Sequence, residues 1–180
     1  GKSAPTPKAA AEGQDFVMCC VGNDNDLREV TLGANGAFVG IGKGKVFVDH
    51  TTASAEIARE LYAAAKKGGF DAIDAPVSGG QAGAENGALT VMCGGDEAPF
   101  GVAKPVIDAY ARACNLMGTP GSGQLAKMVN QICIAGLVQG LAEGIHFAKK
   151  SGLDIEKLIA TISKGAAQSW QMENRYKTMN

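Results

Sequence analysis

The sequence has 180 residues, 46% of them hydrophobic, which is enough for a globular chain of one large domain or two small ones. Its 17 basic and 18 acidic side chains nearly cancel and are scattered, which argues against binding to nucleic acid or a membrane surface and favours a small-molecule partner. We identify no apolar stretch long enough to span a bilayer and no signal peptide, so we expect a cytoplasmic protein.

The cysteines are odd in number and lie within apolar runs without C-x-x-C spacing, which disfavours both a disulfide framework and a zinc site. We therefore expect no metal, and we expect buried thiols of a reduced protein at Cys19, Cys20, Cys93, Cys114 and Cys133.

The first half of the chain has the pattern of an α/β domain. Residues 1–13 resemble the end of a surface segment, and the short apolar runs 15–21 and 46–49 predict buried parallel strands. Apolar residues then recur at helical spacing from Ser54, which is placed to cap, to Lys67. A strand over 70–77 completes a right-handed parallel unit.

Two further strands are predicted at 89–93 and 113–117, with a helix led by Asp96 between them. These elements make roughly half of a doubly wound, Rossmann-type sheet. After Gly118–Gly123 no β-rich run appears, so we place a domain boundary between residues 1–120 and 121–180.

The second part is predicted to be all α. The helix over 125–142 has very few polar side chains and is apolar around nearly its whole circumference, so we expect it to be buried. Asp154 is placed to cap a further helix, and another begins within 169–179.

A lysine on this apolar helix is the first candidate functional residue. Burial disfavours the charged form and lowers the pKa of an amine, so Lys127 needs a reason to be there. Asn130 and Gln131 follow at three and four residues and share its helix face. A lysine that reaches water from the helix start, beside two structural amides, explains the pattern equally well.

The second candidate is the segment from Asp74 to Gly80, at the carboxyl end of a predicted strand, where open α/β sheets bind ligands. Gly79 and Gly80 would let backbone N–H groups approach a carboxylate, and Ser78 adds a hydroxyl donor. By itself, Ser-Gly-Gly also fits any tight turn. His50, which directly follows a strand, is expected to be structural.

Together these segments resemble one family, the β-hydroxyacid dehydrogenases. The resemblance covers essentially the whole chain, and its most specific parts are Asp74-Ala-Pro-Val-Ser-Gly-Gly80 and Gly121-Ser-Gly123 with Ala126-Lys-Met-Val-Asn-Gln131. It implies the later part of a Rossmann-type domain, a long interdomain helix and the start of an all-α domain that supports homo-oligomers. It also implies hydride transfer between NAD or NADP and a small β-hydroxy acid or its semialdehyde.

The resemblance further implies roles for individual residues. Lys127 would be the acid/base, and Asn130 or Gln131 would orient the substrate. The substrate carboxylate would be held by Ser78, Gly79 and Gly80, and the dinucleotide would be bordered by Val21, Gly22, Asn23 and Thr52.

The sequence departs from the family pattern in the first glycine-rich turn, which should precede Gly1, so we expect weak or no cofactor binding by these 180 residues alone. The competing hypotheses are a non-catalytic binding or dimerisation module on the same fold and a different small-molecule binder built on half a Rossmann sheet. The sequence does not choose the substrate, the cofactor or the direction of reaction.

Overall fold

A computed structural model describes residues 1–179, in which backbone contacts define two compact units, residues 1–128 and the residues from Val129 onward, and each unit is described by itself. The first unit is an α/β sheet domain. Its strands are β1 (Phe16–Cys19), β2 (Val46–Asp49), β3 (Asp71–Asp74), β4 (Val77–Ser78), β5 (Leu89–Gly94) and β6 (Ala111–Gly118). Its helices are α1 (Pro7–Ala11), α2 (Asp24–Leu32), α3 (Ala37–Gly40), α4 (Ala55–Gly68), α5 (Gly80–Glu85) and α6 (Glu97–Ile107).

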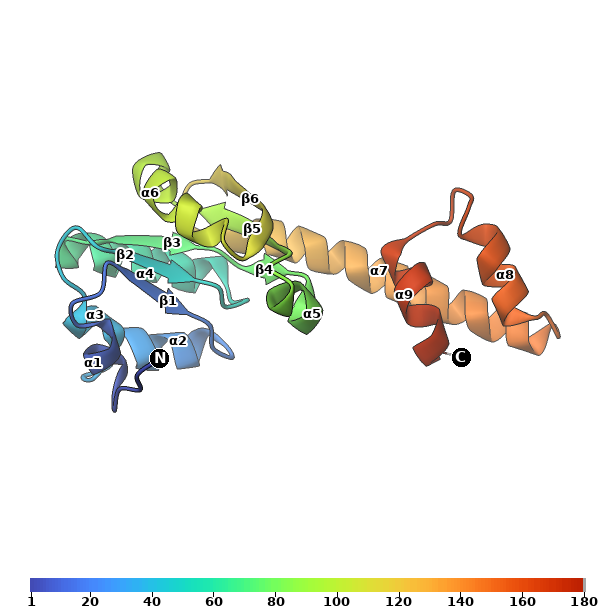
Figure 1. Cartoon of the computed structure of the whole chain (residues 1–180), viewed down its shortest axis with the longest axis horizontal. Coiled ribbons are helices and arrows are strands. Elements are labelled where there is room, and N and C mark those ends of the chain that lie inside the picture. The colour runs from blue at the N-terminus through green and yellow to red at the C-terminus, as the bar shows by residue number, and fades with distance from the viewer. Residues whose placement is uncertain (180) are drawn as a thin grey trace. The chain divides into compact units, whose positions relative to one another are not determined.

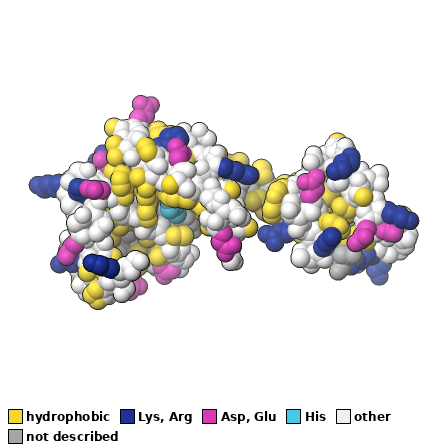
Figure 2. Space-filling model, viewed as in Figure 1, with side chains coloured by type: hydrophobic (Ala, Val, Ile, Leu, Met, Phe, Trp, Pro, Cys, Tyr) yellow, Lys and Arg dark blue, Asp and Glu magenta, His cyan; other side chains and the backbone are white. Residues whose placement is uncertain are grey.

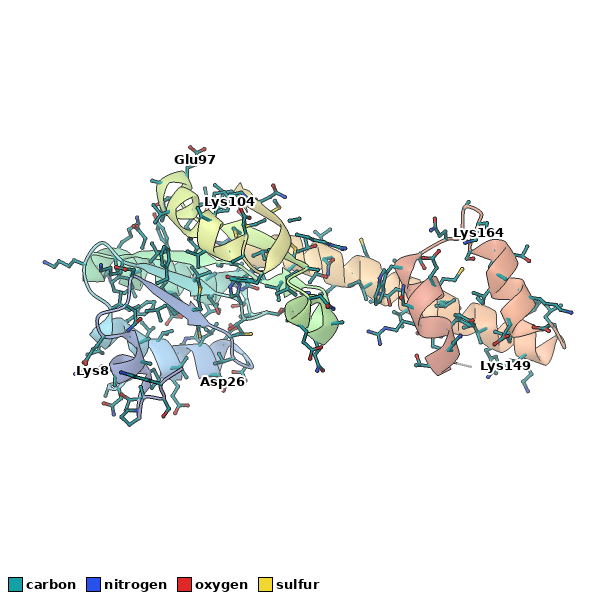
Figure 3. The ribbon with its side chains drawn as sticks, in the orientation of Figure 1. Lys8, Asp26, Glu97, Lys104, Lys149 and Lys164 are labelled. Atoms are coloured by element: carbon teal, nitrogen blue, oxygen red, sulfur yellow. The ribbon has the colours of Figure 1, made fainter. Side chains whose placement is uncertain are left out.

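The sheet has helices on both faces, as the predicted fold class requires. Strands β1, β2 and β3 pair in parallel, and α4 connects β2 to β3. One face of the sheet is covered by α1 to α4, over a core that includes Phe47, Ile57 and Leu61. The other face is covered by α6, whose Ile107 belongs to the same core as Val48 of β2 (Figure 1). Charged side chains lie outside these cores, and Glu97 projects from the start of α6 away from the sheet (Figure 3).

The second half of the sheet is mixed, which the strand predicted over residues 70–77 did not anticipate. That segment forms two strands, β3 and β4, and β5 runs antiparallel to both. The connection over residues 79–88 is shorter than the dozen or so residues that a parallel crossover needs, so the chain has to turn back. Strand β6 then pairs in parallel with β5.

The amino-terminal residues are more ordered than the sequence suggested. Thr6 caps α1 by accepting a hydrogen bond from the backbone N–H of Ala9, and Ala11 is fully buried. Helix α2, which was not predicted, is capped by the Asn23 side chain. Polar residues fill most of α2, so its apolar periodicity is weak and only Leu27 and Thr31 are buried.

The second unit contains most of the long helix α7 (Ser122–Lys150) with α8 (Ile155–Ile162) and α9 (Trp170–Met179). Leu141 and Ile145 of α7 pack with Ile155, Ile159 and Met172 in one small core. Asp154 accepts a hydrogen bond from the backbone N–H of Lys157, which confirms it as the cap of α8.

The prediction that α7 is buried was wrong. Val129 is 62% exposed and Ile132 71% exposed, because the α7 residues buried against α8 and α9 are Leu141, Ile145 and Ala148, further along the helix. By length and composition α7 is also apolar enough to cross a membrane, contrary to our expectation. A single such helix is weak evidence for insertion, and its first turn packs on the sheet.

The prediction of buried thiols was correct for two cysteines and wrong for others. Cys93 on β5 and Cys114 on β6 are buried in the core that α6 covers, Cys19 is half-buried, and Cys20 and Cys133 are exposed. Cys20 follows the last residue of β1 and Cys133 lies on the uncovered side of α7, so an apolar sequence neighbourhood did not ensure burial. All five are free in the part of the chain that the structure describes.

Candidate active site

The candidate site lies where α7 begins, at the carboxyl ends of β2 and β3. Asp49 and Asp74 are paired in register at the last position of these two parallel strands, and both are almost fully buried. Asp49 ends an otherwise apolar strand and Asp74 directly follows the apolar pair Ala72 and Ile73, which was the signal in the sequence that could have drawn attention to them.

Asp74 fixes the first turn of α7. Its carboxylate accepts hydrogen bonds from the backbone N–H groups of Gly121, at 2.8 Å, and Gln124, at 3.0 Å. A helix begins with N–H groups that lack partners inside the helix, and here a side chain from another element satisfies them. Burial raises the pKa of Asp74, and these hydrogen bonds act in the opposite direction.

Two glycines make this contact possible. A Cβ on Gly94 would lie 2.5 Å from a carboxylate oxygen of Asp74, and a Cβ on Gly123 would lie 2.7 Å from the backbone carbonyl oxygen of Asp74. The ends of β3 and β5 and the start of α7 therefore approach one another at backbone distance.

Lys127 stands one turn beyond this contact and is only 8% exposed. Among the residues that the structure describes, it has no hydrogen-bond or salt-bridge partner. Burial alone lowers the pKa of its amine, in the direction that the sequence predicted. The sequence predicted burial of the whole helix, but only its start is buried. Lys127 is buried within the first unit, whereas the apolar residues that follow it are exposed.

The Ser78 loop follows Asp74 directly. Ser78 ends β4 and is half-buried, and its hydroxyl forms no hydrogen bond to another described residue. Gly79 and Gly80 have φ angles of 138° and 62°, a backbone conformation that favours glycine, and both are exposed. The structure therefore presents this segment to solvent as an open turn.

The two loops on the other side of the site are joined to each other. Val21 donates its backbone N–H to the Thr51 hydroxyl at 3.0 Å, which ties the loop after β1 to the loop after β2. Gly22 and Thr52 are exposed. Asn23 is engaged as the cap of α2, where its side-chain oxygen accepts from two backbone N–H groups.

Gln124 is a site residue that sequence reasoning missed. It is 1% exposed, its side-chain oxygen accepts from the backbone N–H of Ala53 at 3.0 Å, and its side-chain nitrogen donates to the Thr51 carbonyl oxygen at 2.7 Å. Glutamine is usually a surface residue, and nothing in the local sequence marks this one as buried.

Asn130 and Gln131 belong to the second unit. Asn130 is half-buried and donates to the side-chain oxygen of Gln131, which is exposed, at 3.0 Å. Their predicted role with the substrate stays a prediction.

His50 has the structural role that we expected. Its Nδ1 lies 2.6 Å from the Ala75 carbonyl oxygen, and its Nε2 lies 2.8 Å from the Tyr110 hydroxyl. Since a carbonyl oxygen only accepts, Nδ1–H donates to Ala75 and the Tyr110 hydroxyl donates to Nε2 of the neutral ring. Burial lowers the pKa of His50, which favours this neutral form.

Comparison with known proteins finds two family models of NAD-binding domains that match the chain. Residues 1–118 match the family model of the NAD-binding domain of 6-phosphogluconate dehydrogenase. Residues 121–180 match the model described as NAD-binding of NADP-dependent 3-hydroxyisobutyrate dehydrogenase. The two matches meet at residues 118–121, beside the predicted boundary, whereas the compact unit extends to Met128 because the first turns of α7 pack on the sheet.

Individual relatives agree with the family models. An uncharacterized oxidoreductase of Shewanella frigidimarina is 66% identical over 99% of the chain and 62% of its own length. A probable mitochondrial 3-hydroxyisobutyrate dehydrogenase-like protein of Arabidopsis thaliana is 44% identical over 94% of the chain and 56% of its own length. The solved Mycobacterium tuberculosis 3-hydroxyisobutyrate dehydrogenase with L-serine superposes with a TM-score of 0.83 at 30% identity, covering 94% of this chain and 57% of that one. The chain thus spans about three fifths of the length of the proteins it matches.

Proposed function

The chain belongs to the β-hydroxyacid dehydrogenase family, and we propose that it serves NAD(P)-dependent hydride transfer to or from a small β-hydroxy acid or its semialdehyde. The observation that carries the proposal is Lys127, a side chain only 8% exposed whose amine has no hydrogen-bond or salt-bridge partner in the described residues, on a helix whose first turn is fixed to Asp74. Asp74 in turn leads directly into the Ser78 loop.

We assign proton transfer to Lys127. Oxidation of an alcohol by hydride transfer leaves a proton that has to be removed from the oxygen, and lowering the pKa of the amine raises the fraction of neutral amine that can accept it. The pKa of Lys127 is lowered because the side chain is buried without a counter-ion. The same burial therefore favours the neutral amine that proton transfer requires.

We assign the substrate carboxylate to Ser78, Gly79 and Gly80. The support is the free Ser78 hydroxyl and the exposed glycine backbone of this turn. The L-serine named with the M. tuberculosis relative is itself a small β-hydroxy acid. We assign the orientation of the substrate to Asn130 or Gln131, because they follow Lys127 by three and four residues on one continuous helix.

The residues at the carboxyl ends of β1 and β2 fit the nicotinamide end of NAD or NADP. The exposed Gly22 backbone and the exposed Thr52 lie on two loops that the Val21–Thr51 hydrogen bond holds together, at the edge where open α/β sheets bind ligands. Asn23 already caps α2, so we expect it to border the cofactor as part of the loop backbone. When bound, the nicotinamide supplies the hydride acceptor or donor.

We further propose a homo-oligomer in the cytoplasm, without nucleic acid or membrane partners. The exposed apolar side chains of α7 provide a surface for a second copy. Free cysteines suit a reducing compartment. On the face shown in Figure 2, basic and acidic side chains alternate over the surface of each unit, without the single-sign patch that nucleic acid or anionic lipid attracts.

Replacement of Lys127 tests the proposal. In the chain extended to the length of its relatives, Lys127→Met should lower kcat by roughly a hundredfold to ten-thousandfold and leave cofactor affinity nearly unchanged, because general acid/base groups contribute on that scale. The thermal midpoint should hold or rise, since the thioether avoids the cost of burying an amine. The exposed Lys149→Met is the matched control. A kcat that falls only together with the thermal midpoint would make Lys127 a structural residue.

A further inference from the structure

The side-chain amide of Gln124 joins two parts of the site that are distant in sequence. It forms hydrogen bonds to the backbone of the loop after β2 on both sides of Thr52. It accepts from the Ala53 N–H and donates to the Thr51 carbonyl oxygen. Thr52 itself stays exposed between these two contacts. One amide therefore determines how far the Thr52 backbone lies from α7.

The backbone of Gln124 is held independently of its side chain. Its N–H donates to the Asp74 carboxylate, and the close packing of Gly123 on β3 and β5 prevents the first turn of α7 from shifting. Lys127 follows three residues later, so it stands about one turn further along the same helix. Gln124 thus has its backbone fixed to the strand before the Ser78 loop and its side chain fixed to the Thr52 loop.

We propose that Gln124 is a positioning residue that sets the separation between Thr52, on the cofactor side of the site, and Lys127. It acts through the Thr52 loop and does not itself touch the substrate. The inference rests on the proposed function. Displacing reacting groups by about 1 Å can cost roughly a hundredfold in rate, so two hydrogen bonds that fix this separation bear directly on kcat.

A purely structural role would have a different signature. Two neutral hydrogen bonds contribute only modestly to folding, and their loss would lower the thermal midpoint without a particular effect on turnover. A variant can distinguish the positioning role from the structural role if its new side chain keeps one hydrogen bond at every pH. That side chain should form the other hydrogen bond only when the side chain is protonated.

Gln124→Glu is such a variant. An ionised carboxylate still accepts from Ala53 N–H but cannot donate to the Thr51 carbonyl oxygen, whereas a protonated carboxyl does both. Burial raises the pKa of the introduced group, so protonation falls within an accessible pH range. Charged or titratable groups near this contact include Asp74 on β3, Asp49 on β2, Asp24 on α2, Cys19 on β1, Arg59 on α4 and Lys127 on α7. The new carboxyl titrates together with them, so the kcat of Gln124→Glu is compared at each pH with wild type and with Gln124→Met, which has the same neighbours and no new carboxyl.

The experiment measures kcat, KM for 3-hydroxyisobutyrate, cofactor Kd and thermal midpoint between about pH 6 and pH 8, in the chain extended to the length of its relatives. Gln124→Met should lower kcat roughly tenfold to hundredfold while KM changes less than about threefold. The kcat of Gln124→Glu relative to wild type should rise roughly tenfold as the pH falls across this range. Gln14→Met makes the same substitution at an exposed position at the opposite end of β1 and should leave all four quantities unchanged.

The inference is overturned if Gln124→Met keeps kcat within about threefold of wild type, or if the loss in Gln124→Glu does not depend on pH. If Gln124→Met fails to fold, the pH profile of Gln124→Glu decides alone. The Lys127→Met variant separates the two proposals. Full activity without the lysine refutes the proposed function, whereas an inactive lysine variant beside a fully active Gln124→Met refutes only the positioning role.

Discussion

The first turns of α7 and the segment that follows them reverse the usual relation between polarity and burial. At the start of the helix Gln124 is 1% exposed and Lys127 is 8% exposed, while further along Val129 and Ile132 are 62% and 71% exposed. The polar residues are buried because the sheet, the Thr52 loop and Asp74 surround the first turns. The apolar residues are exposed because the α7 residues buried against α8 and α9 lie further along the helix.

Gln124 and Lys127, both at the start of α7, differ in whether their side chains form hydrogen bonds. Both ends of the Gln124 amide are hydrogen-bonded, as buried polar groups nearly always are. Lys127 is buried without such a partner in the described residues, and a cost of this kind is tolerated mainly at functional sites. Among the described residues, the fully buried side-chain atom without a hydrogen-bond partner is Asp49 Oδ2, so Lys127 is the candidate because of its place on α7 and the lowered pKa of its amine.

The largest expected effect on the free energy of unfolding comes from replacing a glycine of α7 by alanine, at Gly123 in its first turn and at Gly140 further along, in the 180-residue chain. Gly123→Ala should destabilise the first unit by about 3 kcal/mol or more, because the new Cβ meets backbone atoms of β3 and β5 that have no room to move. Gly140→Ala should stabilise the second unit by about 0.5–1 kcal/mol, because a Cβ there meets nothing and alanine favours helix.

Urea unfolding distinguishes the two. Circular dichroism follows the whole chain, while Trp170, the single tryptophan, reports on the second unit. Equal shifts for the two variants would show that the ends of α7 do not differ in packing.

The next effect concerns the buried polar end and its dependence on pH. Burial raises the pKa of Asp49 from 3.8 to about 6, and Asp74 and Asp24 add to the shift while hydrogen bonds from Thr51 oppose it. Its second carboxylate oxygen is buried without a hydrogen-bond partner. The folded protein therefore holds a proton that the unfolded chain releases between about pH 4 and pH 6.

The sign follows from this difference. The contribution of Asp49 to stability is fully present below its unfolded pKa and is lost as the pH rises through about 6, a change of about 3 kcal/mol in the free energy of unfolding. Asp49→Asn should flatten the stability profile between about pH 4 and pH 6, measured by urea unfolding at each pH. Asp71→Asn, on the exposed side of β3, is the control. An unchanged slope in Asp49→Asn would assign the proton to another group.

The smallest effect tests the exposed apolar segment of α7 around Ile132. Ile132→Gln should change the free energy of unfolding of the 180-residue chain by less than about 0.5 kcal/mol, because the side chain is already in water. Leu141→Ala, on the packed side of the same helix, should cost about 2 kcal/mol or more. If Ile132→Gln costs as much as Leu141→Ala, the apolar side of α7 is covered in solution.

The elements with strong periodicity could be predicted from sequence. The apolar run at residues 46–49 and the helical spacing from Ser54 to Lys67 correspond to β2 and α4 within one residue. The α/β fold class followed from the order of these elements. The polar helix α2, the short α1 and the reversal of the chain between β4 and β5 could not be predicted, because local pattern is weak there and connection length decides the strand direction.

By itself, the sequence determined the fold class, the family resemblance and the candidate residues in the Ser78 loop and at Lys127, because these depend on residue types at fixed spacings. Only the tertiary structure decided which side chains of α7 are buried, that Asp74 holds the first turn, and that Gln124 grips the Thr52 loop. Hydropathy and helical period describe one helix at a time. Burial and hydrogen bonding depend on which distant segments approach it, and here the absence of a Cβ at Gly94 and Gly123 allows that approach.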